Sequence, residues 1–299
     1  MSKILANVGA IAILLATNLF LFFSEGEKKL TNASSKYFDV LDEEKIRRIS
    51  INSGSYQIEM EEVDDSWILN DKHRADIGFV NTLLSVLSQV EFSRSIENFK
   101  SEKLGSVKLG FNDDTETEFD FASNLTRTKS YFIRNRNAVE VSVPGYKDQV
   151  VDLFLMHPDQ WRDRLILDAS WRSIQKLSLY GPNREALEIR FDDKFFLVNN
   201  KSPRDSSAVV DYLNQFQYLE ANEMISRGRF PQLDSLSETL PLAILKIDDI
   251  KFDHDLEIKV YSSMHQQSYH LVILGEKMMV IDTRRVKGLL ASSEDFLGS

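Results

Sequence analysis

Histidine is the side chain most often used as a metal ligand and as a general base near neutral pH. The chain has five: His73, His157, His254, His265 and His270. None of them forms a motif such as H-E-x-x-H, and on a strand His265 and His270 would point to opposite faces. We therefore expect no metal site and no catalytic site from the histidines.

Among the acidic residues, nothing in the sequence singles out a pair of carboxylates such as glycoside hydrolases use. Asp253-His254-Asp255 has too few ligands for a calcium loop, and Asp64-Asp65, Asp113-Asp114 and Asp192-Asp193 stand between strand patterns, where acidic pairs are typical of turns. The chain contains no Cys, which excludes disulfides and thiolate chemistry. No P-loop, G-x-S-x-G or G-x-G-x-x-G motif is present. We expect a protein that is not an enzyme and that needs no cofactor.

Trp161-Arg162-Asp163-Arg164 is the segment best suited to binding, because Trp and Arg dominate binding hot spots. Two interpretations are open for Trp161, Arg162 and Arg164. They can contact a partner, or Trp161 can pack between two repeats while the arginines pair with nearby acids. We favour the second interpretation.

A second candidate surface lies near the N-terminus. Asn7, Ile11, Leu14 and Asn18 are spaced by 4, 3 and 4 residues, so on a helix they share one stripe. Asparagine side chains can hydrogen-bond between membrane helices. Either the stripe is a docking face for another subunit's helix, or Asn7 snorkels near the cytoplasmic end of the helix and Asn18 is merely tolerated.

The stripe lies in an uncharged apolar run, Ile4–Phe23, that is long enough to span a bilayer as a helix. The run ends in large residues, which is atypical of a signal-peptide cleavage site. We interpret residues 1–23 as a cytoplasmic start and a transmembrane anchor in the lipid bilayer, and residues 24–39 as a linker. The expected location is the inner (cytoplasmic) membrane, as a single-pass protein with its globular part outside the cytoplasm.

Charge excludes one class of partner. The formal net charge is −10, with 46 acidic and 36 basic residues among 299. Nucleic-acid binding needs Lys/Arg-rich faces, so we expect no nucleic acid partner.

The chain then repeats itself. Ile46-Arg-Arg-Ile-Ser-Ile51 recurs as Ile174-Gln-Lys-Leu-Ser-Leu179, an offset of 128 residues. In both halves two further strand patterns follow, and then a helix with one apolar face, over 77–90 and 209–219. After each helix come period-two strands at an offset of 138, so the second copy has extra residues, which we place in 226–242.

These patterns predict two tandem duplicated modules, 40–166 and 167–299, both of ordinary domain size. The expected fold class is α+β: an N-terminal transmembrane helix followed by two modules with mainly antiparallel sheets.

The order of these features resembles a family of bacterial membrane-anchored proteins, domain of unknown function 4340. The residues that carry the resemblance are packing patterns: Trp67-Ile-Leu69, Ala75-Asp76 with its helix, Tyr131-Phe-Ile133, Val139-Glu-Val141 and Trp161-Arg-Asp-Arg-Leu165. In the second copy Phe195-Phe-Leu197 replaces the Trp pattern. Because members are often encoded beside gliding-motility-type ABC transporter subunits, the resemblance implies an extracytoplasmic accessory role.

The expected function is therefore a non-enzymatic, membrane-anchored accessory subunit of an envelope complex. The complex would be an ABC-type exporter or a gliding-motility-type system, whose membrane subunits are the partners. The alternative is an anchored periplasmic binding module for a soluble ligand or an envelope polymer.

Overall fold

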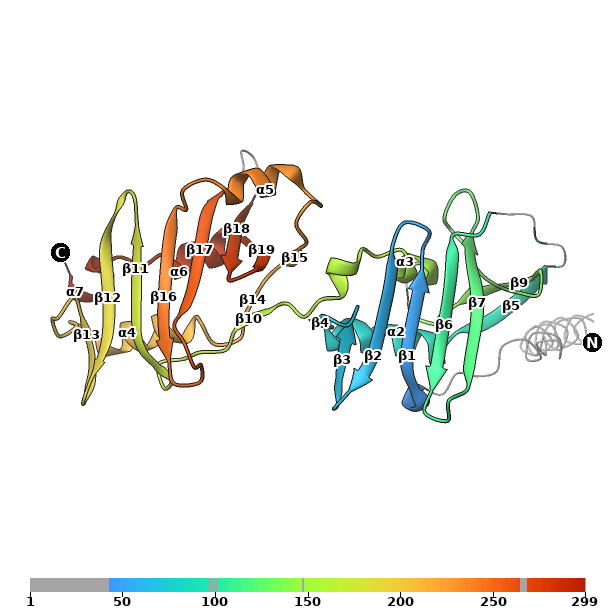
Figure 1. Cartoon of the computed structure of the whole chain (residues 1–299), viewed down its shortest axis with the longest axis horizontal. Helices are drawn as coiled ribbons and strands as arrows, with labels where there is room; N and C mark the ends of the chain where they lie inside the picture. Colours follow the sequence, from blue (N-terminus) through green and yellow to red (C-terminus); the bar gives the residue numbers. More distant parts are fainter. Residues whose placement is uncertain (1–42, 97–98, 100–101, 147, 264–267, 299) are drawn as a thin grey trace, which may run out of the picture. The chain divides into compact units, whose positions relative to one another are not determined.

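The computed structural model describes residues 43–298, except 97–98, 100–101, 147 and 264–267. The chain divides into two compact units (Figure 1). Unit 1 comprises the residues up to Asp71 together with Gly78–Met156, and unit 2 comprises Lys72–Ile77 together with His157–Ser299. The segment 157–166, which the sequence placed with the first module, thus belongs to unit 2, as does the short strand β4 (His73–Arg74).

Unit 1 is built around an antiparallel sheet in which the strands follow the order β3-β2-β1-β6-β7-β8-β9-β5. The strands are β1 (Ile46–Asn52), β2 (Gln57–Val63), β3 (Ser66–Leu69), β5 (Glu91–Ile96), β6 (Gly105–Phe111), β7 (Glu116–Ser123), β8 (Ser130–Arg134) and β9 (Asn137–Ser142). The helical elements are η1 (Glu43–Lys45), α2 (Ile77–Ser88) and α3 (Val150–Phe154).

Unit 2 has an antiparallel sheet in the order β13-β12-β11-β16-β17-β18-β19-β15, and a separate pair β10-β14. Its strands are β10 (Leu165–Leu167), β11 (Ile174–Gly181), β12 (Arg184–Asp192), β13 (Phe195–Val198), β14 (Leu219–Glu220), β15 (Glu223–Ile225), β16 (Ala243–Asp249), β17 (Leu256–Ser263), β18 (Tyr269–Leu274) and β19 (Lys277–Asp282). Its helices are η2 (Pro158–Trp161), α4 (Ser206–Asn214), α5 (Pro231–Ser237), α6 (Thr283–Leu289) and α7 (Glu294–Leu297).

The two sheet orders are the same once β1 is matched with β11 and β6 with β16. Even the irregularity of the central ladder recurs. The pairing of β1 with β6 shifts between Ile46 and Arg48, and that of β11 with β16 shifts between Ile174 and Lys176, at the offset of 128. A β-bulge is a specific local feature, so its recurrence at matched positions indicates two copies of one fold.

A side-chain hydrogen bond recurs as well. In unit 1 Asn70 Oδ1 accepts from the backbone N–H of Glu59 at 2.8 Å, and in unit 2 Asn199 Oδ1 accepts from that of Glu188 at 2.8 Å. Both asparagines have a positive φ, which Asn tolerates better than most residues. Each therefore fixes the chain where it leaves β3 or β13.

Alternation along the strands of unit 2 separates two cores. Val272 and Met279 belong to the main core, to which α4, α6 and α7 contribute Leu213, Val286 and Phe296. Their neighbours along the strands, such as Leu271, face a smaller core that Leu233 of α5 covers. Because successive strand residues point to opposite faces, α5 covers the face opposite to α4 and α6.

Helix α4 begins before the range 209–219 that the apolar pattern predicts, and it ends at Asn214. Asp205 is the N-cap of α4, and its carboxylate accepts from the N–H of Ser207 at 2.8 Å. At the other end of the core, the Tyr212 hydroxyl donates to the carbonyl of Leu289 at 2.9 Å. Burial raises the pKa of this hydroxyl, so it stays a donor.

The expected fold class, α+β with an N-terminal transmembrane helix, is wrong. The structure is mostly antiparallel sheet, with 45% strand and 21% helix. Each module has one helix of moderate length against eight sheet strands, so the helical layer that periodicity suggested is a minor one. Among the residues that the structure describes, no helix is long and apolar enough to cross a membrane. Ile4–Phe23, the source of that expectation, lies outside the described residues.

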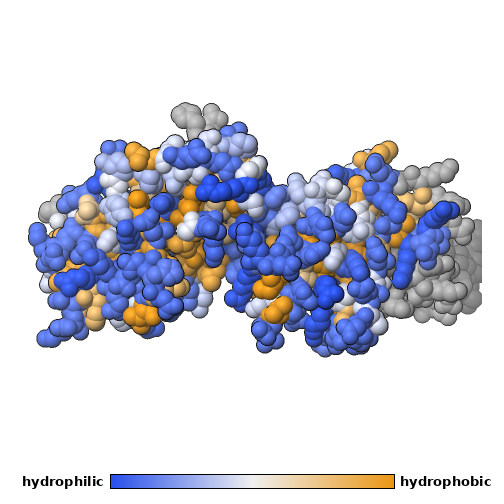
Figure 2. Space-filling view, viewed as in Figure 1, coloured by the Kyte–Doolittle hydropathy of each residue, from blue (hydrophilic) through white to orange (hydrophobic). Residues whose placement is uncertain are grey.

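Hydrophilic residues predominate on the face shown in the space-filling view, where hydrophobic residues form small patches (Figure 2). A candidate site must therefore be found among polar groups and their contacts.

Candidate functional site

A short ladder within unit 2 brings residues 74–76 against residues 161–163. The N–H of Asp76 donates to the carbonyl of Trp161 at 2.7 Å, and the N–H of Asp163 donates to that of Arg74 at 2.8 Å. Ala75 and Arg162 form the antiparallel bridge between them. The ladder places His73 and Arg74 beside a segment that follows them by almost 90 residues.

Helix η2 sets the direction of this segment. Its N-cap is His157, whose Nδ1 accepts from the N–H of Asp159 at 3.1 Å, and the Gln160 side chain accepts from the N–H of His157 at 2.9 Å. Pro158 occupies the first turn, where its missing N–H costs nothing. This reciprocal cap ends the preceding chain sharply and leaves Asp159 and Arg162 one turn apart.

Asp159 is the centre of a buried polar network, with 2% of its surface exposed. Its carboxylate accepts from the Ser226 hydroxyl at 2.5 Å and from the Ser226 N–H at 2.9 Å. The guanidinium groups of Arg162 and Arg229 lie at 3.2 and 3.3 Å from it. Burial by itself would raise the pKa of Asp159, but the hydrogen bonds from Ser226 and Arg162 outweigh burial, and the pKa lies below its usual value.

The network depends on the extra residues of the second copy. Ser226 and Arg229 follow β15 and precede α5, inside the segment 226–242. Arg229 also pairs with Glu223 at 2.6 Å. The inserted segment is thus held to the segment 157–162 by charge-assisted hydrogen bonds, which are the stronger class.

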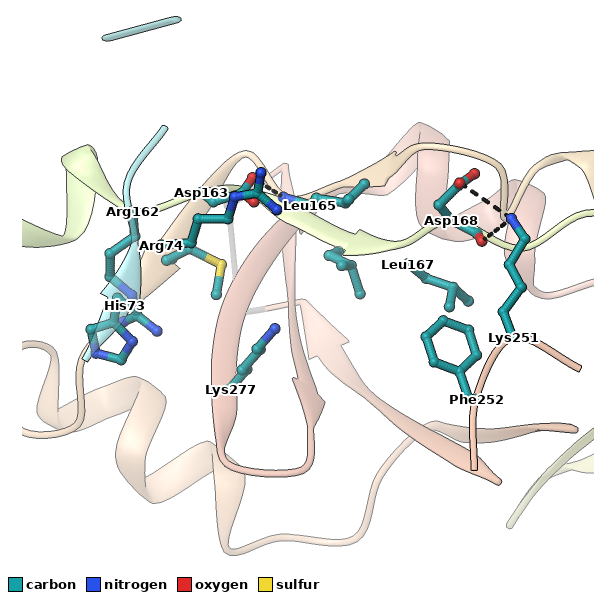
Figure 3. A pocket seen from close by; sticks show the side chains of 12 residues that line it. His73, Arg74, Arg162, Asp163, Leu165, Leu167, Asp168, Lys251, Phe252 and Lys277 are labelled. Atoms are coloured by element: carbon teal, nitrogen blue, oxygen red, sulfur yellow. Dashed lines mark hydrogen bonds and ion pairs between the residues drawn. The ribbon is translucent and has the colours of Figure 1, made fainter. Parts of the chain in front are cut away.

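A pocket of about 450 Å³ opens next to the network (Figure 3). Its walls come from β4, from the chain between η2 and β11, from β15, from the turn after β16 and from the start of β19. The lining residues are His73, Arg74, Arg162, Asp163, Leu165, Ile166, Leu167, Asp168, Met224, Lys251, Phe252 and Lys277.

Cations outnumber anions in this lining. Four Arg or Lys side chains face two carboxylates, in a chain whose net charge is −10. Lys251 pairs with Asp168 at 3.3 Å, and the Asp163 carboxylate accepts from the N–H of Leu165 at 3.0 Å. Lys277 points from the start of β19 towards the middle of the pocket (Figure 3).

The electrostatic effect of these cations is visible at His73. Partial burial lowers the pKa of its imidazole, and the positive charges of Arg162, Lys72 and Lys277 lower it further, against a smaller opposing effect of Asp159. The pocket therefore disfavours an additional positive charge at His73. The same positive charges would attract an anion.

The structure gives different surroundings to the three candidate residues of the Trp-Arg-Asp-Arg segment, Trp161, Arg162 and Arg164. Trp161 is completely buried, which removes it as a surface hot spot. Arg162 is 7% exposed and lines the pocket while it pairs with Asp159. Arg164 pairs with Asp76 at 3.0 Å and keeps 39% of its side chain exposed. The expected pairing of the arginines with nearby acids is therefore present.

The other expected site lies outside what the structure describes. Asn7, Ile11, Leu14 and Asn18 all precede residue 43. Among the histidines, Nδ1 of His270 lies 2.9 Å from the carbonyl oxygen of Tyr261. Within the described part of the chain, no group of three or more His, Asp or Glu residues is arranged to hold a metal ion.

Sequence reasoning did not find Asp159, Ser226, Arg74 or Lys277. No short motif joins them, because they come together only through the ladder and the insertion. The sequence offered one signal: the second copy has an insertion, and the two copies must differ there. No sequence pattern, however, places this insertion near the Trp-Arg-Asp-Arg segment.

Comparisons of the chain with protein-family models, with curated proteins and with solved structures gave no match. The geometry of unit 2 and the duplication are therefore the observations on which a function has to rest.

Proposed function

We propose that the chain is a non-enzymatic accessory subunit of an envelope complex, an ABC-type exporter or a gliding-motility-type system. Its two modules bind the membrane subunits of that complex from outside the cytoplasm.

The observation that carries this proposal is the duplication. Both units have the same strand order, the same β-bulge and the same asparagine hydrogen bond after β3 or β13. Helix α5 and the hydrogen bonds of Asp159 with Ser226, in contrast, belong to the second copy. Function is determined by sites added to a fold rather than by the fold. Two copies with different attachments give one chain two different binding surfaces, which is what a subunit that joins two partners needs.

The absence of Cys supports the same proposal. A chain without thiols suits an oxidising compartment outside the cytoplasm.

The test is affinity purification of the full tagged chain, at its natural level, from detergent-solubilised cells that encode it, followed by mass spectrometry. We expect permease and ATPase subunits to be enriched over a tagged protein of the same compartment. Purification of the chain alone, with no membrane subunit enriched in repeated experiments, would contradict the proposal.

The pocket in unit 2 favours a second candidate, a binding module for a soluble ligand or an envelope polymer. A cavity of about 450 Å³ lies in the size range of small-molecule sites. This candidate predicts a chain that purifies alone and whose melting temperature rises with a ligand.

A further inference from the structure

Arg162 is a buried cation with hydrogen-bonding capacity to spare. Its side chain is 9% exposed, and among the described residues its one hydrogen-bond acceptor is Oδ1 of Asp159. A guanidinium carries five N–H donors in a fixed fork. Because Arg162 also lines the pocket, the remaining donors are available to a group that enters it.

Two further cations of the lining have no carboxylate partner within the described residues. Arg74 comes from β4 and Lys277 from the start of β19, so separate elements present their charges to one space. Lys251, in contrast, is already paired with Asp168. The unpaired positive charge of the pocket is thus concentrated on Arg74 and Lys277, next to Arg162.

Another part of the lining is apolar. Leu165, Leu167, Met224 and Phe252 contribute apolar side chains, and Figure 3 shows Leu167 and Phe252 next to each other, away from His73 and Arg162. A ligand that fits this division has a charged end and an apolar body. Small-molecule sites commonly combine apolar walls with a few polar groups that fix orientation.

We infer that this pocket binds a small organic carboxylate, whose negative end contacts Arg162, Arg74 and Lys277 and whose apolar part packs against Leu167 and Phe252. A carboxylate offers the two oxygens that a guanidinium fork binds best.

The lining favours a carboxylate with an apolar body over inorganic phosphate, because phosphate has no apolar part to pack against Leu167 and Phe252. The inference does not depend on the proposed role in a membrane complex, since it concerns a site within unit 2 and is tested without any partner.

The experiment titrates N-acetyl-L-leucine into the purified full chain and follows binding by calorimetry and the His73 ring signals by NMR. We expect saturable binding and a raised His73 pKa, because a bound carboxylate adds a negative charge nearby. The matched probe N-acetyl-L-leucinamide lacks the charge and is expected not to bind. Equal binding of acid and amide would overturn the inference.

Two other probes identify the source of the carboxylate. A short peptide acid that ends in leucine binds at least as well as N-acetyl-L-leucine if the natural ligand is a chain terminus, and more weakly if it is a free acid. Inorganic phosphate is expected to bind less well than either. Phosphate that binds more tightly than the carboxylates would contradict the assignment.

Variants test the residues. Arg74→Gln and Lys277→Gln change exposed side chains, so the fold is expected to survive. Each is expected to weaken carboxylate binding about tenfold, as the loss of one charge-assisted hydrogen bond does. Lys287→Gln, an exposed lysine on α6 that does not line the pocket, is the matched control and is expected to bind as the unaltered chain does. Unchanged binding in both pocket variants would overturn the inference.

Discussion

His157 is an N-cap residue whose role requires a neutral ring. Its Nδ1 accepts from the N–H of Asp159 at 3.1 Å, and a protonated imidazole has no acceptor. Partial burial lowers the pKa of His157, and the charge of Arg229 lowers it further, although Asp159 and Glu223 act in the opposite direction.

The consequence is a stability that depends on pH. The folded-state pKa of His157 is lower than the unfolded value of about 6.5, so its contribution is fully present above that value and is lost as pH falls towards the folded pKa. We expect the free energy of unfolding of unit 2 to decrease between pH 7 and 5. Urea unfolding at several pH values measures it.

His157→Asn is the matched variant. Asparagine keeps an oxygen acceptor for the cap and does not titrate. The slope of stability against pH is expected to be smaller in this variant, and the remaining slope comes in part from His73, whose pKa is lowered as well. An unchanged slope in His157→Asn would show that the cap does not couple to protonation.

Asp159 neutralises two arginines in a nearly dry site. In Asp159→Asn, Arg162 and Arg229 lose the carboxylate at 3.2 and 3.3 Å, and breaking a buried ion pair typically costs about 3–5 kcal/mol. We expect a loss of stability of that size in unit 2 by chemical denaturation. Asp168→Asn, which removes a carboxylate with 35% of its side chain exposed, is the control and is expected to cost less than about 1 kcal/mol. Equal effects of the two variants would contradict the central place of Asp159.

At the scale of elements, the repeated asparagine after β3 and β13 offers a test of the duplication. Asn199→Ala loses the acceptor for Glu188 and puts alanine at a φ of 46°, which only a few residue types tolerate. We expect faster amide exchange in β12 and β13, measured by hydrogen exchange of the full chain, because the end of the β12–β13 ladder loses the hydrogen bond that fixes it.

The equivalent change in the first copy, Asn70→Ala, is expected to affect β2 and β3 instead. Asn199→Asp retains the acceptor for Glu188 but loses the Nδ2 donor to the carbonyl of Ala186, so its exchange is expected to lie between that of the unaltered chain and that of Asn199→Ala. If Asn199→Ala and Asn70→Ala changed the same strands, the two copies would not be independent units.

Much of each sheet could be predicted from period-two patterns. β1, β8 and β9 lie where alternating residues place them, and the offsets of 128 and 138 recur in the ladders. β6 was missed because it contains two glycines, Gly105 and Gly110, and glycine is depleted in strands. Gly105 is required there, since a Cβ would meet the carbonyl oxygen of Asn52 and the ring of Phe121.

The site was less predictable than the sheets. Arg162 and Arg164 stood out by residue type, but their partners could not be predicted. Helix η2 places Asp159 near Arg162, and the ladder between residues 74–76 and 161–163 places Asp76 near Arg164. Ser226 lies 67 residues from Asp159, and no local pattern encodes such a contact. The same contacts explain why the segment 157–166 belongs to unit 2 and not to the first module.

At the scale of the whole molecule, one chain contains two copies of a sheet with the same strand order, and the second copy has an insertion that holds a polar network beside a cationic pocket. Since the copies share a scaffold and differ in their attachments, they are suited to different ligands or partners.

Cross-linking mass spectrometry on the complex purified from cells tests this role most directly. Lysines are available in both units, among them Lys108 in unit 1 and Lys259 in unit 2. We predict cross-links from lysines of both units to membrane subunits, with different partner sites for each unit. Cross-links confined to the chain itself, in a preparation where membrane subunits cross-link to one another, would contradict the proposal that the two modules bind the complex.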